Sequence, residues 1–349
     1  MEDLRNVYRN NRSTLKDLIP LEYPLCISIE PSNLCNFKCV MCYHGNNEDD
    51  PKAAPLSNAK PEMVEKVIED IKSWTRDGKQ VIQLIKLYSL GEPLINAQTP
   101  EILRMVKEAG ICKQVEITTN ASLLSKEVAR KLVDYGLDTL RISVYAVDEK
   151  RHLRVTKSKI SPNDIADNVR YLREYRDSIG KKSPRIIAKM FETMTQEDEE
   201  FVEKYKGIAD EVGFDKVFRI DLGGADPFEN VYGEGKADQF HSDSLQKGSI
   251  LGYKHACRYP FTHITVRNDG SVICCCSDWR KELLIGNIME HSLEHLWNSK
   301  TLYNIRKRML ETKGMGWRVC KDCEIPCRDF PEDDVSNVDI GKIGYKNDY

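Results

Sequence analysis

The sequence has no run of about 18 apolar residues, which is the length that a membrane-spanning helix requires. Its first residues, MEDLRNVYRNNRS, are polar and mixed in charge, so they lack the apolar core of a secretory signal. It also has no basic block and no acidic tail, and its 52 Lys and Arg are balanced by 55 Asp and Glu. We therefore expect a cytoplasmic protein with no membrane and no nucleic-acid partner.

Cysteine, in contrast, is abundant, with twelve residues in the chain. Because cytosolic thiols stay reduced, clustered cysteines indicate metal ligands or reactive groups rather than disulfides. Cys26 and Cys112 lie apart in apolar-alternating stretches and are expected to be small buried residues. The other ten form an early and a late group, which consist of Cys35, Cys39 and Cys42, and of Cys257, Cys274, Cys275, Cys276, Cys320, Cys323 and Cys327.

Strands and helices alternate between the two cysteine groups. Strand-like segments cover residues 24–32, 81–93, 114–120, 138–146, 184–192 and 216–224. The helices between them have recognisable ends, such as Gly110 after one helix and Ser161-Pro162 before another, and the last is predicted over residues 196–213. Strands alternating with helices of this length predict a parallel sheet with helices outside. Six units are too few for the eight-stranded barrel, so the predicted α/β fold is a partial (β/α)6 barrel.

The early cysteines follow the first predicted strand with the spacing Cys-x3-Cys-x2-Cys. Reacting groups of such folds gather at the carboxyl ends of the strands. Three thiolates can hold three irons of a [4Fe–4S] cluster and leave the fourth iron open to a small molecule. A structural zinc site would need four closed ligands, of which His44 could supply one. The pattern resembles that of the radical S-adenosylmethionine (SAM) family, which favours the cluster.

The resemblance extends to the ends of the later strands. SLGEP, residues 89–93, resembles the family's Gly-Glu-Pro motif, in which Gly91 would allow close backbone approach and Glu92 would face the methionyl amino group. Met41 stands where the family usually has an aromatic residue, and Ala121 stands where Gly often follows TN. The SAM-binding residues that the resemblance implies are Met41, Gly91, Glu92, Pro93, Thr118, Thr119, Asn120 and Ser143. Lys189, within the fifth predicted strand, is added to these candidates because of its position.

The late cysteines resemble the auxiliary-cluster module of the same family, whose longer form is called SPASM and whose shorter form is called twitch. Its pattern is matched by Cys257, by Gly270-x4-Cys275 and by Cys320-x2-Cys323, with a hairpin expected around residues 268–270. No cysteine follows Cys327, so the resemblance implies four ligands and one auxiliary [4Fe–4S] cluster, which makes two clusters in all. A four-cysteine zinc ribbon would use the same residue types.

These motifs divide the chain into five parts. We expect an N-terminal extension over residues 1–24, the radical SAM partial barrel over 25–222 and a bridging segment over 223–256. A small domain with a β-hairpin, helices and the auxiliary cluster would cover 257–330, and a C-terminal tail 331–349.

The chemistry that the family implies starts with one electron from a flavodoxin- or ferredoxin-type donor. The reduced cluster cleaves SAM, and the resulting 5′-deoxyadenosyl radical abstracts a hydrogen atom from the substrate. We predict oxidation of a secondary alcohol of a small polyol, sugar or aminocyclitol to a ketone, with the auxiliary cluster taking the second electron. Arg219 and Asp221, at the end of the sixth predicted strand, are candidates for binding a polar substrate or taking its proton.

Three other functions use the same motifs. A carbohydrate epimerase would need a cysteine hydrogen-atom donor, and Cys274, Cys276 and Cys327 are the candidates. If residues 274–276 form a strand, the side chains of the first two point away from that of Cys275. A ribosomal-peptide-modifying enzyme is less favoured, because residues 1–24 are too short for a leader-binding domain. An iron–sulfur electron carrier would have no use for SLGEP and TTN.

Overall fold

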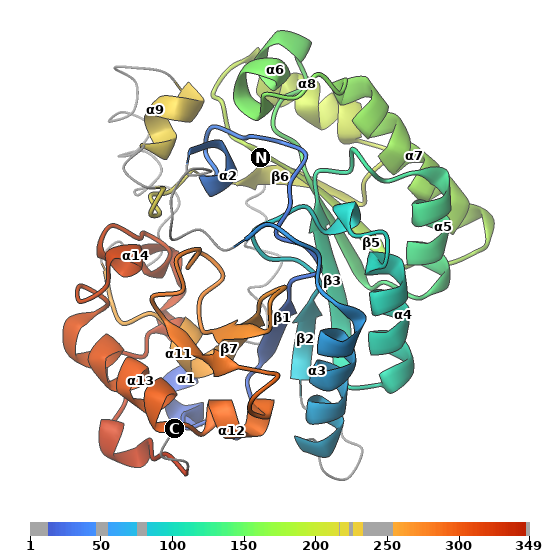
Figure 1. Ribbon diagram of the computed structural model, residues 1–349. Coiled ribbons are helices and arrows are strands. Elements are labelled where there is room, and N and C mark those ends of the chain that lie inside the picture. Colours follow the sequence, from blue (N-terminus) through green and yellow to red (C-terminus); the bar gives the residue numbers. More distant parts are fainter. Residues whose placement is uncertain are drawn as a thin grey trace.

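The computed structural model describes residues 13–46, 55–74, 82–215, 217–222, 226–232 and 254–346. The start of the predicted N-terminal extension and most of the predicted bridging segment lie outside these ranges. The described residues contain a nine-stranded sheet in the order β6-β5-β4-β3-β2-β1-β7-β8-β9, which is not closed into a barrel (Figure 1). Its strands are β1 Cys26–Ile29, β2 Ile82–Lys86, β3 Cys112–Thr119, β4 Thr139–Ser143, β5 Arg185–Phe191, β6 Glu211–Asp215, β7 His263–Val266, β8 Ser271–Ile273 and β9 Leu284–Asn287.

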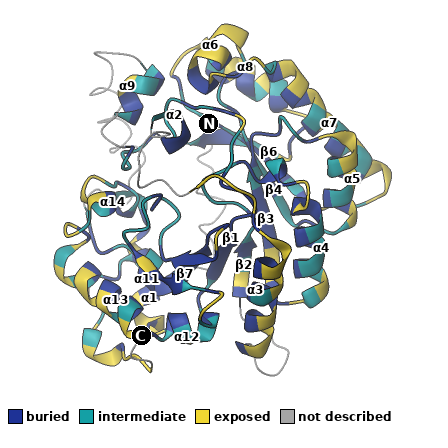
Figure 2. Ribbon diagram, viewed as in Figure 1, coloured by how far each residue is buried: buried dark blue, intermediate teal, exposed yellow. Residues whose placement is uncertain are grey.

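Strands β1 to β6 are all parallel to their neighbours, and helices follow them on the outer face. In Figure 2 the buried sides of these helices face the strands and their exposed sides face outward. This arrangement confirms the predicted partial barrel. The helices of this part are α2 Tyr43–Asn46, α3 Pro61–Trp74, α4 Thr99–Ala109, α5 Lys126–Asp134, α6 Glu149–Thr156, α7 Pro162–Ser178, α8 Gln196–Tyr205 and α9 Pro227–Tyr232.

Local sequence signals account for several helix ends. Gly110 ends α4 with a positive φ of 63°, which an L side chain rarely adopts. The Ser161 hydroxyl accepts a hydrogen bond from the Asn163 N–H at the start of α7, and Pro162 occupies the first helical position. Helix α3 buries seven of its residues, among them Trp74, whose ring contacts those of Tyr23 and Trp297.

The sixth strand is not where the sequence predicted it. Helix α8 ends at Tyr205 instead of continuing to residue 213, and Gly207 follows with φ 90°. Strand β6 is the sequence EVGFD, and its start is fixed because the Asp210 carboxylate accepts a hydrogen bond from the Ile186 N–H of β5 at 2.7 Å. Residues 217–221, which we expected to form the strand, lie beyond it. The apolar VF-x-I pattern of that segment imitates a strand better than EVGFD does.

The C-terminal module continues the same sheet. Strand β7 pairs in parallel with β1, from Cys26↔His263 to Ile29↔Val266, and antiparallel β8 and β9 follow. The predicted hairpin is confirmed, and Gly270 occupies its turn with φ 83°. The remaining helices of this module are α11 Tyr259–Thr262, α12 Leu293–Trp297, α13 Lys300–Thr312 and α14 Arg318–Lys321, with short 3-10 turns at Pro326–Arg328, Pro331–Asp333 and Ile340–Lys342.

The described ends of the chain pack together beneath this module. Helix α1, Leu15–Leu18, contributes Leu15 to a cluster that also contains Phe261 and Met309. Val335 and Ile343 from the C-terminal tail complete the same cluster. In the described part of the chain no helix is long and apolar enough to cross a membrane.

Candidate active site and auxiliary cysteine site

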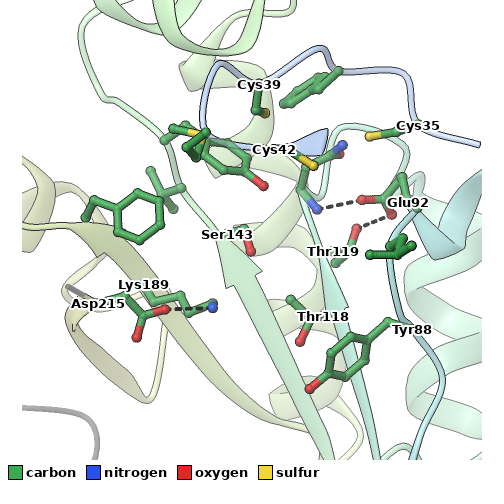
Figure 3. Close-up of a pocket in the computed structure, with 18 of the residues that line it drawn as sticks. Cys35, Cys39, Cys42, Tyr88, Glu92, Thr118, Thr119, Ser143, Lys189 and Asp215 are labelled. Atoms are coloured by element: carbon green, nitrogen blue, oxygen red, sulfur yellow. Dashed lines mark hydrogen bonds and ion pairs between the residues drawn. The ribbon is translucent and has the colours of Figure 1, made fainter. Parts of the chain in front are cut away.

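A pocket with a volume of about 260 Å³ lies at the carboxyl ends of the parallel strands (Figure 3). All three early cysteines line it. Among the predicted SAM-binding residues only Pro93 is absent from the lining, because it lies buried at the start of the 3-10 turn Pro93–Ile95. The others that line the pocket are Met41, Gly91, Glu92, Thr118, Thr119, Asn120, Ser143 and Lys189.

The loop that carries the early cysteines is fixed by backbone contacts. The N–H groups of Lys38 and Val40 donate to the carbonyls of Thr156 and Val155, both at 2.9 Å. These acceptors belong to α6, a helix that we did not predict from the sequence. At the other end of the loop, a Cβ on Gly45 would lie only 2.3 Å from the carbonyl oxygen of Cys39. Glycine is therefore required where the chain turns back on the loop.

The early thiols are suited to holding a metal cluster. Burial raises the pKa of Cys35 to about 12 and also raises the pKa values of Cys39 and Cys42, so the free thiols are protonated and a bound metal would displace their protons. Among the described residues no three His, Cys, Asp or Glu side chains are arranged to hold a single metal ion. Burial lowers the pKa of the His44 imidazole to about 4. Three thiols around one pocket fit an open-sided [4Fe–4S] cluster.

Glu92 contacts its own chain more extensively than the sequence suggested. Its Oε1 accepts from the Thr119 hydroxyl at 2.6 Å and from the Leu94 N–H at 3.1 Å, and its Oε2 accepts from the Asn120 N–H at 2.8 Å. A carboxylate has about four acceptor positions, which leaves about one for a ligand in the pocket. Burial raises the pKa of Glu92 to about 7, although the three hydrogen bonds lower it.

Glycine is required at position 91 because two backbone segments of the protein pack directly against each other there. A Cβ at this position would lie 2.3 Å from the Ser32 carbonyl oxygen and 2.6 Å from that of Leu34. The segment after β2 therefore packs directly on the segment after β1. The next peptide secures this contact, because the Glu92 N–H donates to the Leu34 carbonyl at 2.8 Å.

Several residues of the pocket region were missed in the sequence. Tyr88, Tyr145 and Asp215 line the pocket, and the Tyr88 hydroxyl donates to Glu116 Oε1 at 2.6 Å. Asp215 forms an ion pair in the pocket, because Lys189 Nζ lies 2.7 Å from its Oδ2 (Figure 3). Tyr88 and Tyr145 could have been found from the sequence, because each lies two positions from another polar residue of its predicted strand. Asp215 was missed because the sixth strand was misplaced.

Arg219 and Asp221 do not line this pocket. The Arg219 guanidinium contacts Asp226 at 3.1 Å, and the backbone N–H of Arg219 donates to Glu324 Oε2 at 2.9 Å. Asp221 forms an ion pair with Arg280, and its carbonyl accepts from the Trp279 indole. Both residues thus connect the segment after β6 to the C-terminal module, which corrects their predicted place at the end of a barrel strand.

The late cysteines divide into two sets. A second, largely apolar pocket is lined by the four that we predicted as auxiliary ligands, Cys257, Cys275, Cys320 and Cys323, together with residues such as Met309 and Val319. Backbone N–H groups two residues further along the chain face three of these sulfurs, as in the 3.4 Å contact from Ser277 N to Cys275 Sγ. Such hydrogen bonds are typical of thiolates that bind iron–sulfur clusters.

The other three late cysteines do not line this pocket. Strand β8 ends at Ile273 after a register shift, so the predicted strand geometry of residues 274–276 is wrong. Cys274 is fully buried in the main core. Cys276 lies near Tyr259, whose pKa is raised by burial and further by this thiol. Cys327 is partly buried in the turn Pro326–Arg328.

Comparison with known proteins agrees with this geometry. Residues 29–184 match the model of the Radical SAM superfamily, and residues 257–324 match that of SPASM, an iron–sulfur cluster-binding domain. The chain belongs to the radical SAM superfamily. Its first domain therefore uses SAM and a [4Fe–4S] cluster, and its second binds additional iron–sulfur clusters. Which cysteines hold which cluster remains a proposal that rests on the two pockets.

Curated relatives of this radical SAM protein are distant. A tungsten-containing aldehyde ferredoxin oxidoreductase cofactor-modifying protein from Pyrococcus furiosus is 22% identical over 325 residues, which cover 85% of this chain and 86% of that protein. A probable GTP 3′,8-cyclase from Sulfolobus acidocaldarius is 36% identical over 123 residues, which cover 35% of this chain and 34% of that protein.

Solved structures share the fold. SuiB of Streptococcus suis bound to S-adenosylmethionine superposes with a TM-score of 0.63 at 19% identity, covering 97% of this chain and 83% of SuiB. BtrN in complex with AdoMet and 2-DOIA gives a TM-score of 0.54 at 15% identity, covering 86% and 93%. Because these identities are low, they establish a common fold and not a common reaction.

Proposed function

We propose that this radical SAM enzyme oxidises a secondary alcohol of a small polyol, sugar or aminocyclitol to a ketone. The observation that carries the proposal is the second pocket, which gathers four of the seven late cysteines. Four thiolates would hold one auxiliary [4Fe–4S] cluster with no open iron. A fully ligated cluster suits the transfer of one electron better than the binding of a substrate.

The first pocket provides the other requirements of the reaction. When bound, the early cluster and SAM supply a carbon radical that removes one hydrogen atom from the substrate. Cys35, Cys39 and Cys42 would hold that cluster, and a flavodoxin- or ferredoxin-type protein would reduce it. The substrate must then lose a proton from its hydroxyl group and one electron to give a ketone.

Asp215 is positioned to accept that proton. Burial by itself would raise the pKa of Asp215, but Lys189 and Arg141 lower it below its usual range. The carboxylate is thus ionised at neutral pH, and its partner Lys189 can stabilise negative charge on the substrate oxygen. The relative that aligns over 85% of this chain is named as a cofactor-modifying protein, which supports a small-molecule substrate.

Mass spectrometry of anaerobic reactions tests this function. The reconstituted enzyme, SAM and a reductant would be incubated with panels of polyols, sugars and aminocyclitols. We expect a product that has lost two hydrogen atoms, and we expect its amount to rise together with that of 5′-deoxyadenosine. A product of unchanged mass that takes up solvent deuterium would instead establish an epimerase.

Epimerisation is the second candidate because of the position of Cys276. Its thiol influences the pKa values of Tyr259 and Cys26, and Cys26 belongs to β1 of the barrel. A thiol on this side of the module could return a hydrogen atom to a substrate radical. Cys274 is unsuited to that role, since it lies in the core.

A further inference from the structure

Two further basic residues, Lys86 and Arg141, lie one layer below the pocket, and neither of them lines it. Arg141 precedes the pocket residue Ser143 by two positions on β4, and Lys86 pairs in register with Glu116, which precedes the pocket residue Thr118 by two positions on β3. Residues two apart on a strand share a face and are separated by roughly 6.6 Å. Lys86 and Arg141 therefore lie on the same inner face, roughly 6.6 Å below the pocket residues. This distance is about the length of a small sugar molecule.

Positive charge is in excess on this inner face. Lys189 pairs with Asp215, and Arg185 pairs with Glu211. Arg141 Nη1 lies 3.9 Å from Glu116 Oε2, and Glu116 also accepts from Tyr88. Together with Lys86, the inner faces of β2 to β6 carry four basic groups (Lys86, Arg141, Arg185 and Lys189) and three carboxylates (Glu116, Glu211 and Asp215).

Lys86 carries the excess charge. Within the described residues its ammonium forms no ion pair and no hydrogen bond, and it lies over the Tyr88 ring, with Nζ 5.8 Å from the centroid. Its register partner on β3 is Glu116, the carboxylate that Arg141 and Tyr88 already contact. The neighbouring His263 adds no further positive charge, because burial lowers the pKa of its imidazole well below the usual value. A largely enclosed cation is costly unless a negative group approaches it.

Building on the proposed function, we propose that the substrate carries an anionic group, a carboxylate or a phosphate, which binds at Lys86 and Arg141. The alcohol to be oxidised then lies nearer the pocket mouth, beside Lys189 and Asp215. Lys86, Arg141 and Glu116 together carry one net positive charge, which one such group offsets. The inference narrows the substrate class to sugar acids or phosphorylated sugars and polyols, and it excludes an aminocyclitol whose ammonium would face Lys86.

Calorimetric titration with simple anions tests the site without turnover. The reconstituted protein, with its clusters oxidised and SAM at saturation, would be titrated with inorganic phosphate, with acetate and with neutral glycerol. We expect at least one anion to bind and glycerol not to bind. Tighter binding of phosphate would identify a phosphorylated substrate, and tighter binding of acetate a carboxylate.

Variants of Lys86 decide whether the anion binds at this position. Lys86→Gln is expected to weaken anion binding by about tenfold or more, since a hydrogen bond to a charged group is lost. Lys86→Arg, which keeps the charge, should retain binding, and circular dichroism with iron analysis shows that each variant is folded and loaded. The matched control is Lys113→Gln, an exposed lysine on the neighbouring strand β3, which should bind as the wild type does.

Two results would overturn the inference: binding of neither anion, or equal affinity in Lys86→Gln and Lys113→Gln. The outcome is independent of the proposed oxidation. If anions bind through Lys86 but no substrate loses two hydrogen atoms, the site stands and the dehydrogenase proposal fails. If a neutral or cationic polyol is oxidised and Lys86→Gln leaves anion binding unchanged, the dehydrogenase proposal stands and the anion site fails.

Discussion

Lys189 and Asp215 face one another across two neighbouring parallel strands, with 2.7 Å between Nζ and Oδ2. Both residues line the pocket that also contains the three early cysteines. A carboxylate and a cation therefore lie in the pocket where we propose that the substrate presents its hydroxyl group beside SAM. This pair gives the proposed oxidation its most direct test.

We expect Asp215→Asn to lower ketone formation by about 100-fold or more, because general bases contribute factors of this order. SAM cleavage should continue, since the amide leaves the cysteine loop unchanged. The ratio of 5′-deoxyadenosine to ketone, measured by liquid chromatography, should therefore rise. Glu211→Gln is the control, since this carboxylate lies on the same strand but pairs with Arg185. Equal ketone yields from Asp215→Asn and the wild type would remove Asp215 from the mechanism.

Binding of SAM should depend on the protonation of Glu92. Burial raises its pKa to about 7, and only the ionised carboxylate offers the remaining acceptor to an amino group. SAM affinity should therefore rise by up to about tenfold between roughly pH 6 and pH 8, because the ionised fraction rises by that factor. Equilibrium dialysis of the reconstituted protein measures this change.

The same shift predicts how Glu92 affects stability. Its pKa in the folded protein, about 7, exceeds its ordinary value of 4.5, so between these values the folded state binds more protons than the unfolded state. The contribution of Glu92 to the free energy of unfolding should thus fall as pH rises through this window.

The control for the predicted pH dependence of SAM binding is Glu92→Gln, whose SAM affinity should not change between roughly pH 6 and pH 8. A pH-independent affinity in the wild type would mean that Glu92 does not contact SAM.

Gly91→Ala should destabilise the fold by about 3 kcal/mol or more, because the added Cβ would overlap two backbone carbonyls that cannot move independently. Thermal unfolding of the purified protein measures the change. Gly344→Ala is the matched control, since nothing lies within 4 Å of its added Cβ, and it should leave the melting temperature unchanged. A stable Gly91→Ala variant would show that the segment after β2 can separate from that after β1.

Most of the fold could be predicted because the parallel strands carry continuous apolar patterns. The exception is β6, whose sequence EVGFD is polar at its ends and contains a glycine. Its position depends on a tertiary contact, the hydrogen bond between Asp210 and β5, which periodicity does not reveal. The pairing of β7 with β1 was also beyond sequence reasoning, since it joins residues more than 200 positions apart.

The cysteine sites were predicted more accurately than the substrate pocket. Ligand spacing is a local pattern, and the structure groups Cys35, Cys39 and Cys42, and then the four late cysteines, as that pattern indicated. Arg219 and Asp221 were chosen by their position relative to a strand, so the error in β6 carried over to them. The pairing of Lys189 with Asp215 needed the true register.

The two cysteine pockets predict two separable clusters. Replacing Cys35, Cys39 and Cys42 by Ala should leave about four irons per chain, where the wild type holds about eight, and should abolish SAM cleavage. Replacing Cys320 and Cys323 by Ala should also leave about four irons, yet SAM cleavage should continue without ketone formation. Iron analysis and 5′-deoxyadenosine assays measure both effects. Cys112→Ala, outside both pockets, should keep about eight irons. Full iron content in the triple variant would contradict the assignment.

Cys276 distinguishes oxidation from epimerisation. An epimerase needs a hydrogen-atom donor, and a cysteine S–H is the most readily cleaved side-chain bond near the proposed substrate path. Cys274 is enclosed in the core, whereas the Cys276 thiol influences the pKa values of Tyr259 and of Cys26 on β1, so Cys276 is the first candidate to test. If the enzyme is a dehydrogenase, Cys276→Ser should retain much of the ketone formation, and so should Cys327→Ser.

Cys274→Ala is the matched control, because alanine fills most of its apolar site without burying a hydroxyl group. All three variants should form ketone and 5′-deoxyadenosine in the wild-type ratio. If instead Cys276→Ser alone stops product formation while hydrogen abstraction continues, the thiol is a hydrogen-atom donor. Deuterium from solvent would then appear at the reacting carbon of the wild-type product, and epimerisation would replace oxidation as the function.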